Sequence, residues 1–362
     1  MANSNLTNAK KTKNDEFYTQ YIDIQKEVSA YIDYNPDVFR GKTILLPCDD
    51  PEWSNFTKFF AQNFDLFGIK KLISTSFAIQ SKGYDATYEP TDFEKKNPQY
   101  NDKKTKTNGK IFTLDHDTTN DGKIDLYDLE WEYLEGDGDF NSDEIKALRD
   151  EADIIITNPP FSKFRNFLNW IIEGKKEFLI IGNINAITFK EVFPLMKENK
   201  IWLGPSITSG DREFEVPKDV LDMDKFTGKI RDGKYFQRVV GVRWFTNLDH
   251  GRRHHSIPLM TESDVIKFST KKPFVKYDNY HAIEVSYVKQ IPSDYDGVMG
   301  VPISFLDKYN PDQFEIVGSD YEVKDGKLPY LMNEDWDGKL DRGYINGKRI
   351  YGRILIKHRR TN

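Results

Sequence analysis

The chain of 362 residues contains a single cysteine, Cys48. An intramolecular disulfide is therefore impossible, and a zinc site built from several cysteines is excluded. No apolar run approaches the roughly 20 residues that a membrane-spanning helix needs, and the first residues lack the apolar stretch of a secretory signal. We therefore expect a cytoplasmic protein without contact with a membrane, in a reducing compartment. No metal site is expected.

Basic residues are outnumbered, with 52 lysines and arginines against 58 acidic residues and a net charge of −6. The acid is concentrated, because Asp115 to Asp153 holds 15 acidic residues and only three basic ones, which leaves the rest of the chain net positive. Basic residues cluster at Arg252-Arg253 and at Lys271-Lys272, and residues 342–362 carry seven Lys or Arg and no acid. Such local clusters can bind phosphates whatever the total charge, although solvated charged faces are the alternative.

Short apolar runs alternate with segments of helical periodicity. Strands are expected over 43–47, 71–77, 152–157, 177–182 and 201–204, with a late strand over 239–245 that returns to the same sheet. Helices are expected over 53–66, over 164–172 with Ser162 as the N-cap, and over 190–199. Near-continuous apolar strands between helices are typical of a mostly parallel sheet covered on both faces. The sequence thus predicts an α/β fold.

The remaining segments differ in composition. Residues 1–14 are polar and basic, which favours a flexible arm, and residues 80–135 are polar, turn-rich and acidic, which favours an inserted segment carrying hairpins. Within it, residues 117–128 resemble a calcium-binding loop. The resemblance is incomplete, because Thr119 is a poor ligand and Asp128 replaces the usual glutamate, and a tight hairpin at Asn120-Asp121-Gly122 is the preferred interpretation.

The strongest chemical motif is Asn158-Pro159-Pro160-Phe161, directly after the buried strand Asp153–Thr157. Ligands of open α/β sheets bind beyond the carboxyl ends of the strands. The prolines stiffen the backbone and remove two N–H donors, while the Asn158 side chain adds an acceptor. Two acceptors can bind an aromatic amine, and Phe161 can stack on its ring. A rigid turn without chemistry is the alternative.

This motif resembles the catalytic motif of the N6-adenine and N4-cytosine amino-group methyltransferases. More specifically, the chain resembles the EcoRI-type adenine-specific modification methylases over nearly its full length, with 80–135 and 205–240 the least similar parts. The other stretches that carry the resemblance are residues 15–20, 48–51, 136–140, 178–183, 200–204, 246–249, 276–280, 297–302 and 353–357.

The resemblance implies a Rossmann-like sheet that binds S-adenosyl-L-methionine. The residues that it assigns to the cofactor lie in three segments. The general pattern has a glycine-rich turn in the second, where this chain has Pro47-Cys48-Asp49-Asp50, so we expect a carboxylate to bind there and leave open whether it is Asp49 or Asp50. The assigned residues are Glu16, Phe17, Tyr18, Thr19, Pro47, Cys48, Asp49, Asp50, Asp139 and Phe140.

The resemblance also implies double-stranded DNA as the partner. It divides the chain into a catalytic domain over 15–250, with the acidic hairpin insertion, and a target-recognition region over 251–362. Candidates for contact with the DNA backbone or bases are Arg252, Arg253, Lys271, Lys272, Tyr277, Tyr280, Arg349 and Arg353. Trp244 and Phe245 fall near the expected base pocket, with a role in the strand core as the alternative for at least one of them.

We therefore expect a monomeric, site-specific DNA methyltransferase that modifies N6 of a flipped adenine in a restriction-modification system, with a restriction endonuclease as a possible partner. Two other hypotheses remain open at this point. One is a methyltransferase for another planar amine, such as cytosine N4 or a glutamine side chain. The other is a DNA-binding relative without catalytic activity.

Overall fold

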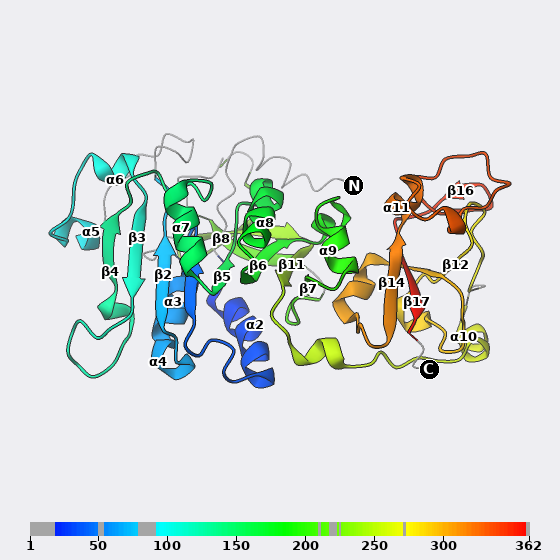
Figure 1. Cartoon of the computed structure of the whole chain (residues 1–362), viewed down its shortest axis with the longest axis horizontal. Helices are drawn as coiled ribbons and strands as arrows, with labels where there is room; N and C mark the ends of the chain where they lie inside the picture. Colours follow the sequence, from blue (N-terminus) through cyan, green and yellow to red (C-terminus); the bar gives the residue numbers. More distant parts are fainter. Residues whose placement is uncertain are drawn as a thin grey trace. The chain divides into compact units, whose positions relative to one another are not determined.

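The computed structural model describes residues 19–49, 54–78, 92–208, 211–216, 223, 226–270 and 273–359. The chain divides into two compact units. The first consists of the described residues of Met1–Phe193 and Ile201–Asp249, and the second of those of Pro194–Lys200 and His250–Asn362. Each unit has its own sheet (Figure 1). The predicted arm over 1–14 lies outside the described residues.

An eight-stranded mixed sheet forms the centre of the first unit, in the order β4-β3-β2-β1-β5-β6-β11-β7. The four strands β2, β1, β5 and β6 are parallel, and β3, β4, β11 and β7 extend the sheet by antiparallel pairing. The strands are β1 (Thr43–Leu46), β2 (Lys71–Thr75), β3 (Lys110–Leu114), β4 (Glu130–Tyr133), β5 (Ile154–Thr157), β6 (Glu177–Asn183), β7 (Trp202–Leu203) and β11 (Val242–Thr246).

Helices pack against this sheet and bury its apolar residues. Phe56 of one helix meets Trp244 of β11 with ring centroids 6.0 Å apart, and Phe164 of another meets Phe245, the next residue of β11, at 5.0 Å. Successive strand residues point to opposite faces, so the two helices cover different faces of the sheet. The helices of this unit are α2 (Tyr21–Tyr34), α3 (Asn55–Gln62), α4 (Phe64–Phe67), α5 (Asp92–Lys96), α6 (Lys104–Thr107), α7 (Asp143–Glu151) and α8 (Phe164–Glu173), with the 3-10 turns η2 (Leu126–Asp128), η3 (Phe161–Lys163) and η4 (Ile184–Thr188).

A separate three-stranded antiparallel sheet belongs to the same unit. Its order is β8-β10-β9, with β8 (Asp211–Val216), β9 (Lys229–Arg231) and β10 (Lys234–Val240). Phe214 and Val239 on one face of this sheet are buried in the core that lies against α2 and α3. The β8-β10-β9 sheet therefore packs against this core through the face that carries Phe214 and Val239.

The second unit is built around a four-stranded sheet in the order β12-β13-β17-β14. Helix α9 (Phe193–Lys197) supplies most of its short first segment. Its other elements are β12 (Ile283–Glu284), β13 (Met299–Val301), β14 (Phe314–Ser319), β15 (Tyr344–Ile345), β16 (Lys348–Arg349), β17 (Ile354–His358), α10 (Glu262–Phe268), α11 (Asp320–Lys324), η6 (Gly251–His254), η7 (Val288–Gln290), η8 (Ile303–Lys308) and η9 (Pro329–Leu331).

The α/β fold and the buried strands over 43–47, 71–77, 152–157 and 177–182 are confirmed. The predicted helix over 53–66 is instead two helices that meet at Asn63, whose amide caps the Phe59 carbonyl. The predicted strand over 239–245 is wrong as one strand, because Gly241, with φ +75°, separates β10 from β11. Ser162 does not cap α8, which begins at Phe164 after η3.

Two further predictions were too simple. The helix expected over 190–199 forms only over Phe193–Lys197. The tight Asn120-Asp121-Gly122 hairpin is also wrong, because residues 115–129 separate β3 from β4.

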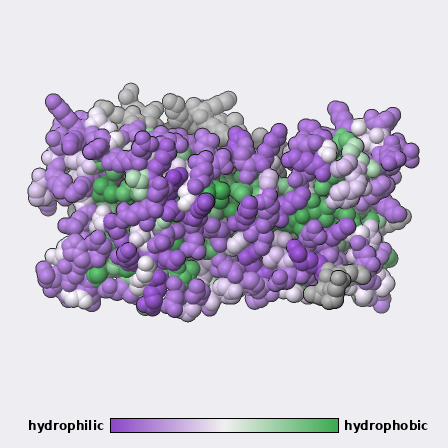
Figure 2. Space-filling model, viewed as in Figure 1, coloured by the Kyte–Doolittle hydropathy of each residue, from purple (hydrophilic) through white to green (hydrophobic). Residues whose placement is uncertain are grey.

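On the face shown in Figure 2, hydrophilic residues predominate and hydrophobic residues show in separate patches. No helix of the described residues is long and apolar enough to cross a membrane.

Candidate functional site

The carboxyl ends of β2, β1 and β5 bring together segments that are far apart in sequence. The Asp49 amide after β1 donates to the Thr75 carbonyl at the end of β2 at 2.9 Å. The Thr157 hydroxyl at the end of β5 lies 2.6 Å from the Pro47 carbonyl. The loop after β1 and the Asn158 motif after β5 therefore lie side by side, at the edge where parallel sheets bind ligands.

A buried carboxylate lies at this edge. The hydroxyls of Thr157 and Ser54 donate to the two oxygens of Asp49 at 2.6 and 2.8 Å, and the Ser74 hydroxyl donates to the Asp49 carbonyl. Ser54 is also the N-cap of α3, accepting from the Phe56 amide at 3.1 Å. The two hydroxyls therefore hold the Asp49 carboxylate in one orientation. Asp50 lies outside the described residues.

Cys48 takes the conformation that a glycine would adopt in this turn. Its φ is +69°, in the left-handed region, and the residue is half-buried. A side chain in this region costs roughly 1–2 kcal/mol relative to glycine. The chain therefore makes the turn expected of a cofactor loop without the glycine.

The segment before α2 approaches the same loop. Thr19 is buried, and its carbonyl accepts from the Asn55 amide nitrogen at 2.8 Å, one residue after Ser54. The Thr19 hydroxyl oxygen is buried and makes no hydrogen bond with any described residue. A buried polar atom of this kind costs stability unless a ligand or water satisfies it. Glu16, Phe17 and Tyr18 lie outside the described residues.

The Asn158 motif begins as soon as β5 ends. Pro159 is buried, whereas Asn158, Pro160 and Phe161 are half-buried, and the Asn158 side-chain oxygen has almost no exposed surface. Phe161 opens η3 and packs edge-on against Phe214 of β8, with ring centroids 6.4 Å apart. The motif thus has its polar side chain at the strand edge and its aromatic ring against the β8-β10-β9 sheet.

The predicted adenine loop, residues 136–140, lies against the extension of β2. The Ala78 amide donates to the Asp137 carbonyl at 2.7 Å, and a Cβ at Gly138 would overlap the Ser76 carbonyl oxygen. The Asp139 carboxylate accepts from the Asn141 backbone and side chain, each at 2.9 Å.

Phe140 of this loop is buried. Its ring lies 5.2 Å from the Phe167 ring and 5.9 Å from that of Trp170. The Lys163 ammonium lies 5.8 Å from the Phe140 ring and 5.6 Å from the Phe77 ring, so η3 connects the Asn158 motif to this loop. Contact of Asp139 and Phe140 with a cofactor stays a prediction.

Sequence reasoning missed Ser54, Thr157 and Lys163. Thr157 is the one polar residue of an otherwise isoleucine strand, and it directly precedes Asn158, which was a readable signal. Ser54 directly precedes a phenylalanine-rich helical stripe, as an N-cap does. Lys163 gave no signal, because its aromatic partners lie elsewhere in the sequence.

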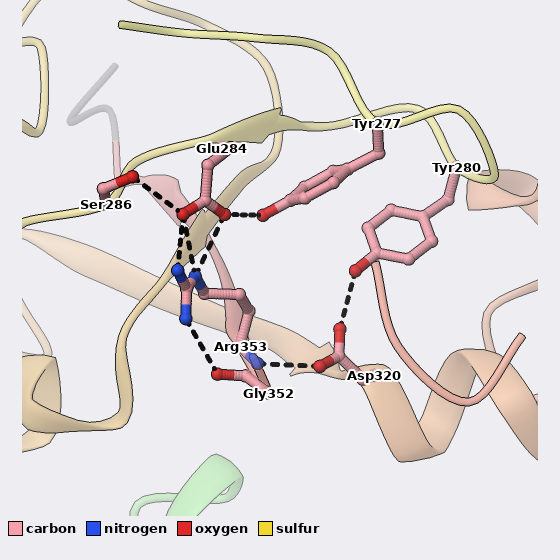
Figure 3. Close-up of polar contacts among 7 residues, drawn as sticks. All are labelled: Tyr277, Tyr280, Glu284, Ser286, Asp320, Gly352 and Arg353. Atoms are coloured by element: carbon pink, nitrogen blue, oxygen red, sulfur yellow. Dashed lines mark hydrogen bonds and ion pairs between the residues drawn. The ribbon is translucent and has the colours of Figure 1, made fainter. Parts of the chain in front are cut away.

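Tyr277 and Tyr280, two of the DNA-binding candidates, are buried in the second unit, and Figure 3 shows the polar contacts that they and Arg353 make. The Tyr277 hydroxyl donates to Glu284 at 2.6 Å, and the Arg353 guanidinium binds the same carboxylate at 2.5 to 3.1 Å. The Tyr280 hydroxyl donates to Asp320 at 2.6 Å, and the Arg353 amide donates to its other oxygen at 2.7 Å. Tyr277, Tyr280 and Arg353 therefore have internal partners, and their contact with DNA stays a prediction.

Burial controls the protonation of this group. It raises the pKa of Asp320 to about 6, against the opposing effects of the Tyr280 and Arg353 hydrogen bonds. Burial also raises the pKa of Tyr280 and of Tyr277, with the neighbouring carboxylates adding to the rise. Both phenols are therefore fixed as donors at neutral pH.

The other basic candidates differ in exposure. Arg253 is buried and donates to Asn199 at 2.6 Å, whereas Arg252 is half-buried in η6. Arg349 of β16 is exposed and pairs with Asp341 at 2.8 Å. Lys271 and Lys272 lie outside the described residues.

The loop that resembles a calcium site closes on itself. Asp117 accepts from the amides of Asn120 and Gly122 at 2.6 and 2.8 Å, and Asp128 accepts from the Thr118, Thr119 and Asp125 amides at 2.8 to 3.0 Å. The hydrogen bond from the Asp125 backbone amide is the largest of the effects that lower the pKa of Asp128 to about 2. Among the described residues, no group of three or more His, Cys, Asp or Glu is arranged to hold a metal ion.

The geometry places the proline-stiffened Asn158 motif beside the buried Asp49 carboxylate. The family model described as "Adenine-specific methyltransferase EcoRI" matches residues 5–359. The chain belongs to this family of adenine-specific DNA methyltransferases, whose membership implies use of S-adenosylmethionine. No solved structure matches the chain significantly.

Three curated relatives cover nearly the whole chain. The type II methyltransferase M.EcoRI of Escherichia coli is 40% identical over 361 residues, which are 99% of this chain and 97% of the relative. M.MgeORF184P of Mycoplasma genitalium is 34% identical over 96% of this chain and 97% of the relative. M.MpnI of Mycoplasma pneumoniae is 33% identical over 98% of each.

Proposed function

We propose that the protein transfers the methyl group of S-adenosylmethionine to N6 of an adenine flipped out of double-stranded DNA. The observation that carries this proposal is the Thr157 hydroxyl, which joins the Asp49 carboxylate to the strand end that bears Asn158. The cofactor, when bound, supplies an electrophilic methyl group on a sulfonium. The mixed sheet serves as a Rossmann-like binding sheet, with the acidic segment near 80–135 as an insertion.

The described residues fit this cofactor. Asp49 offers a carboxylate to an ammonium or a ribose hydroxyl, and the Thr19 hydroxyl has a donor and acceptor to give. Asp139 and Phe140, in the loop against the β2 extension, would contact the cofactor's adenine. Asp49 is the better choice over Asp50, because two hydroxyls hold its carboxylate in one orientation.

Asn158 and the Pro159 carbonyl act on the target base. Both accept hydrogen bonds from the exocyclic amine, which holds the nitrogen lone pair toward the methyl donor, and Phe161 stacks on the base. Catalysis rests on positioning and on these fixed dipoles. Extruding the base costs a few kcal/mol, which stacking and edge contacts offset.

The second unit, as the main part of a region over 251–362, would recognise the target sequence. Arg349 exposes its guanidinium, and with Arg252, Lys271 and Lys272 it is proposed to contact phosphates. Tyr277, Tyr280 and Arg353 would hold the shape of this region from inside. We further propose that the protein is a monomer. We also propose that a cognate restriction endonuclease recognises the same DNA sequence, since the relatives are named type II methyltransferases.

Product analysis tests the function. The protein is incubated with duplex DNA and S-adenosylmethionine carrying a deuterated methyl group, and the nucleosides are analysed by mass spectrometry. Label in N6-methyladenine is expected, whereas label in 4-methylcytosine, or no label in DNA, would overturn the proposal. Asn158→Ala should abolish transfer while DNA affinity stays within severalfold, and Asn166→Ala, at an exposed position of α8, is the control.

A further inference from the structure

The outer face of the β8-β10-β9 sheet has a layered arrangement of charge. The cross-strand pairs Phe236–Glu215, Arg238–Glu213 and Lys234–Arg231 put these side chains on one face, because paired residues of antiparallel strands share a face. The opposite face carries Phe214 and Val239, which are buried in the core. The charged face is therefore the one turned away from the core.

The cations on this face extend beyond the carboxylates. The side chains of Lys229, Arg231, Lys234 and Arg238 are 65%, 51%, 60% and 70% exposed. Their acidic partners Glu213, Glu215 and Asp211 are only 29%, 28% and 14% exposed. The surface that a partner meets is thus a layer of four basic groups, with the carboxylates beneath.

The carboxylates orient the cations without using all their donors. Glu213 accepts from Lys229 at 2.7 Å and from Arg231 at 2.6 Å, and Glu215 accepts from Lys234 at 3.0 Å. A guanidinium has five N–H donors and an ammonium three, so each cation keeps donors for an anion outside. Arg231 also lies 5.3 Å from the Phe236 ring, which further fixes its plane.

The opposite face of the same sheet contacts the Asn158 motif. Phe214 packs on Phe161, and Gln237 is the cross-strand partner of Phe214. Lys234 is three residues from Gln237, roughly 10 Å along a strand. Because residues three apart on a strand point to opposite faces, Lys234 lies on the face that does not contact Phe161.

We propose that this face, formed by Lys229, Arg231, Lys234 and Arg238, binds the phosphates of duplex DNA. The inference rests on the proposed function, which supplies the DNA. A duplex is the partner that fits, because it offers a row of anions to a row of outward cations, and a two-stranded β-ribbon such as β9–β10 fits a DNA groove. The turn at Asp232-Gly233, with φ of +50° and +75°, keeps this ribbon narrow at its end.

The salt dependence of DNA binding tests the proposal. The slope of log K against log salt is negative, and each lost phosphate contact reduces its magnitude by about 0.9. The triple variant Lys229→Gln, Arg231→Gln, Lys234→Gln should therefore reduce this magnitude by about 2 to 3, measured with a fluorescent duplex. Replacing Lys229 and Lys234 by arginine should preserve the slope, which separates loss of charge from local misfolding.

A second triple variant is the matched control. Arg40→Gln, Lys42→Gln and Lys71→Gln remove the same charge from cations that are also ion-paired, at the amino ends of β1 and β2. This control should keep the wild-type slope. An unchanged slope in the first variant, or an equal fall in both, overturns the inference. Failure of the proposed function would instead appear as wild-type protein that places no methyl group on adenine.

Discussion

The Thr157 hydroxyl lies 2.6 Å from the Asp49 carboxylate, across 108 positions of sequence. One residue later the chain reaches Asn158, and five residues after Asp49 it reaches the N-cap of α3. The Thr157 side chain therefore joins the loop after β1 to the Asn158 motif. This contact leads to the first prediction.

Thr157→Val should weaken S-adenosylmethionine binding about tenfold and lower the free energy of unfolding by roughly 1–3 kcal/mol, because a buried carboxylate loses a donor. Calorimetric titration and urea unfolding measure the two effects. Thr157→Ser should restore both. Thr246→Val is the control. The Thr246 hydroxyl of β11 donates to the Phe178 carbonyl of β6 at 2.6 Å, so its loss should reduce stability alone. Equal loss of cofactor affinity in the control would contradict the argument.

Cys48→Val should lower the free energy of unfolding by about 1–2 kcal/mol, because a β-branched residue is strained at the φ of +69°. Cys48→Gly should change it by less than about 1 kcal/mol, since relief of strain offsets the larger freedom of the unfolded chain. Urea unfolding of both variants gives the comparison. If valine is tolerated as well as glycine, the turn does not have the described conformation.

Glu284→Gln should lower the free energy of unfolding by about 3 kcal/mol or more, because the Arg353 charge, only 11% exposed, loses its partner. Arg349→Gln, which breaks the exposed pair with Asp341, should cost less than about 1 kcal/mol. Urea unfolding followed by fluorescence measures both. Similar costs would mean that the Glu284–Arg353 pair is open to solvent.

The pH dependence of stability should contain a contribution from Asp320. Its pKa in the folded chain is about 6, against 3.8 for an ordinary aspartate, so unfolding releases a proton between about pH 4 and 6. The contribution of Asp320 to the free energy of unfolding therefore falls by on the order of 2–3 kcal/mol as pH rises through that window. Above the window this contribution is constant. Asp320→Asn should remove this fall, as urea unfolding at pH 4.5 and pH 7 can measure. A variant with the wild-type difference between the two pH values would refute this.

Sequence patterns predicted the parts of the fold that depend on local periodicity. Isoleucine and leucine runs identified β1, β2, β5 and β6, because buried parallel strands need apolar residues on both faces. The breaks at Asn63 and Gly241 were missed for different reasons. The Asn63 side chain caps the Phe59 carbonyl four residues earlier, a local signal that the phenylalanine periodicity overrode. Gly241 lies where the chain passes from one sheet to another, which depends on the fold.

The site divides in the same way. Asn158 to Phe161 is a continuous motif and could be recognised from the sequence. The carboxylate expected to bind the cofactor could be narrowed only to Asp49 or Asp50. The choice of Asp49 needed Ser54 and Thr157, which only the fold brings to it. Tyr277 and Tyr280 looked suited to contact DNA, and their burial follows from Glu284 and Asp320, partners that no spacing rule indicates.

Gly241 is the single residue between β10, in the β8-β10-β9 sheet, and β11, in the central sheet. Its left-handed backbone would strain any other residue, and a Cβ there would approach Ile184 to 3.2 Å. Substitution at this joint would change the direction in which the β8-β10-β9 sheet leaves the central sheet, without altering the Asn158 motif directly.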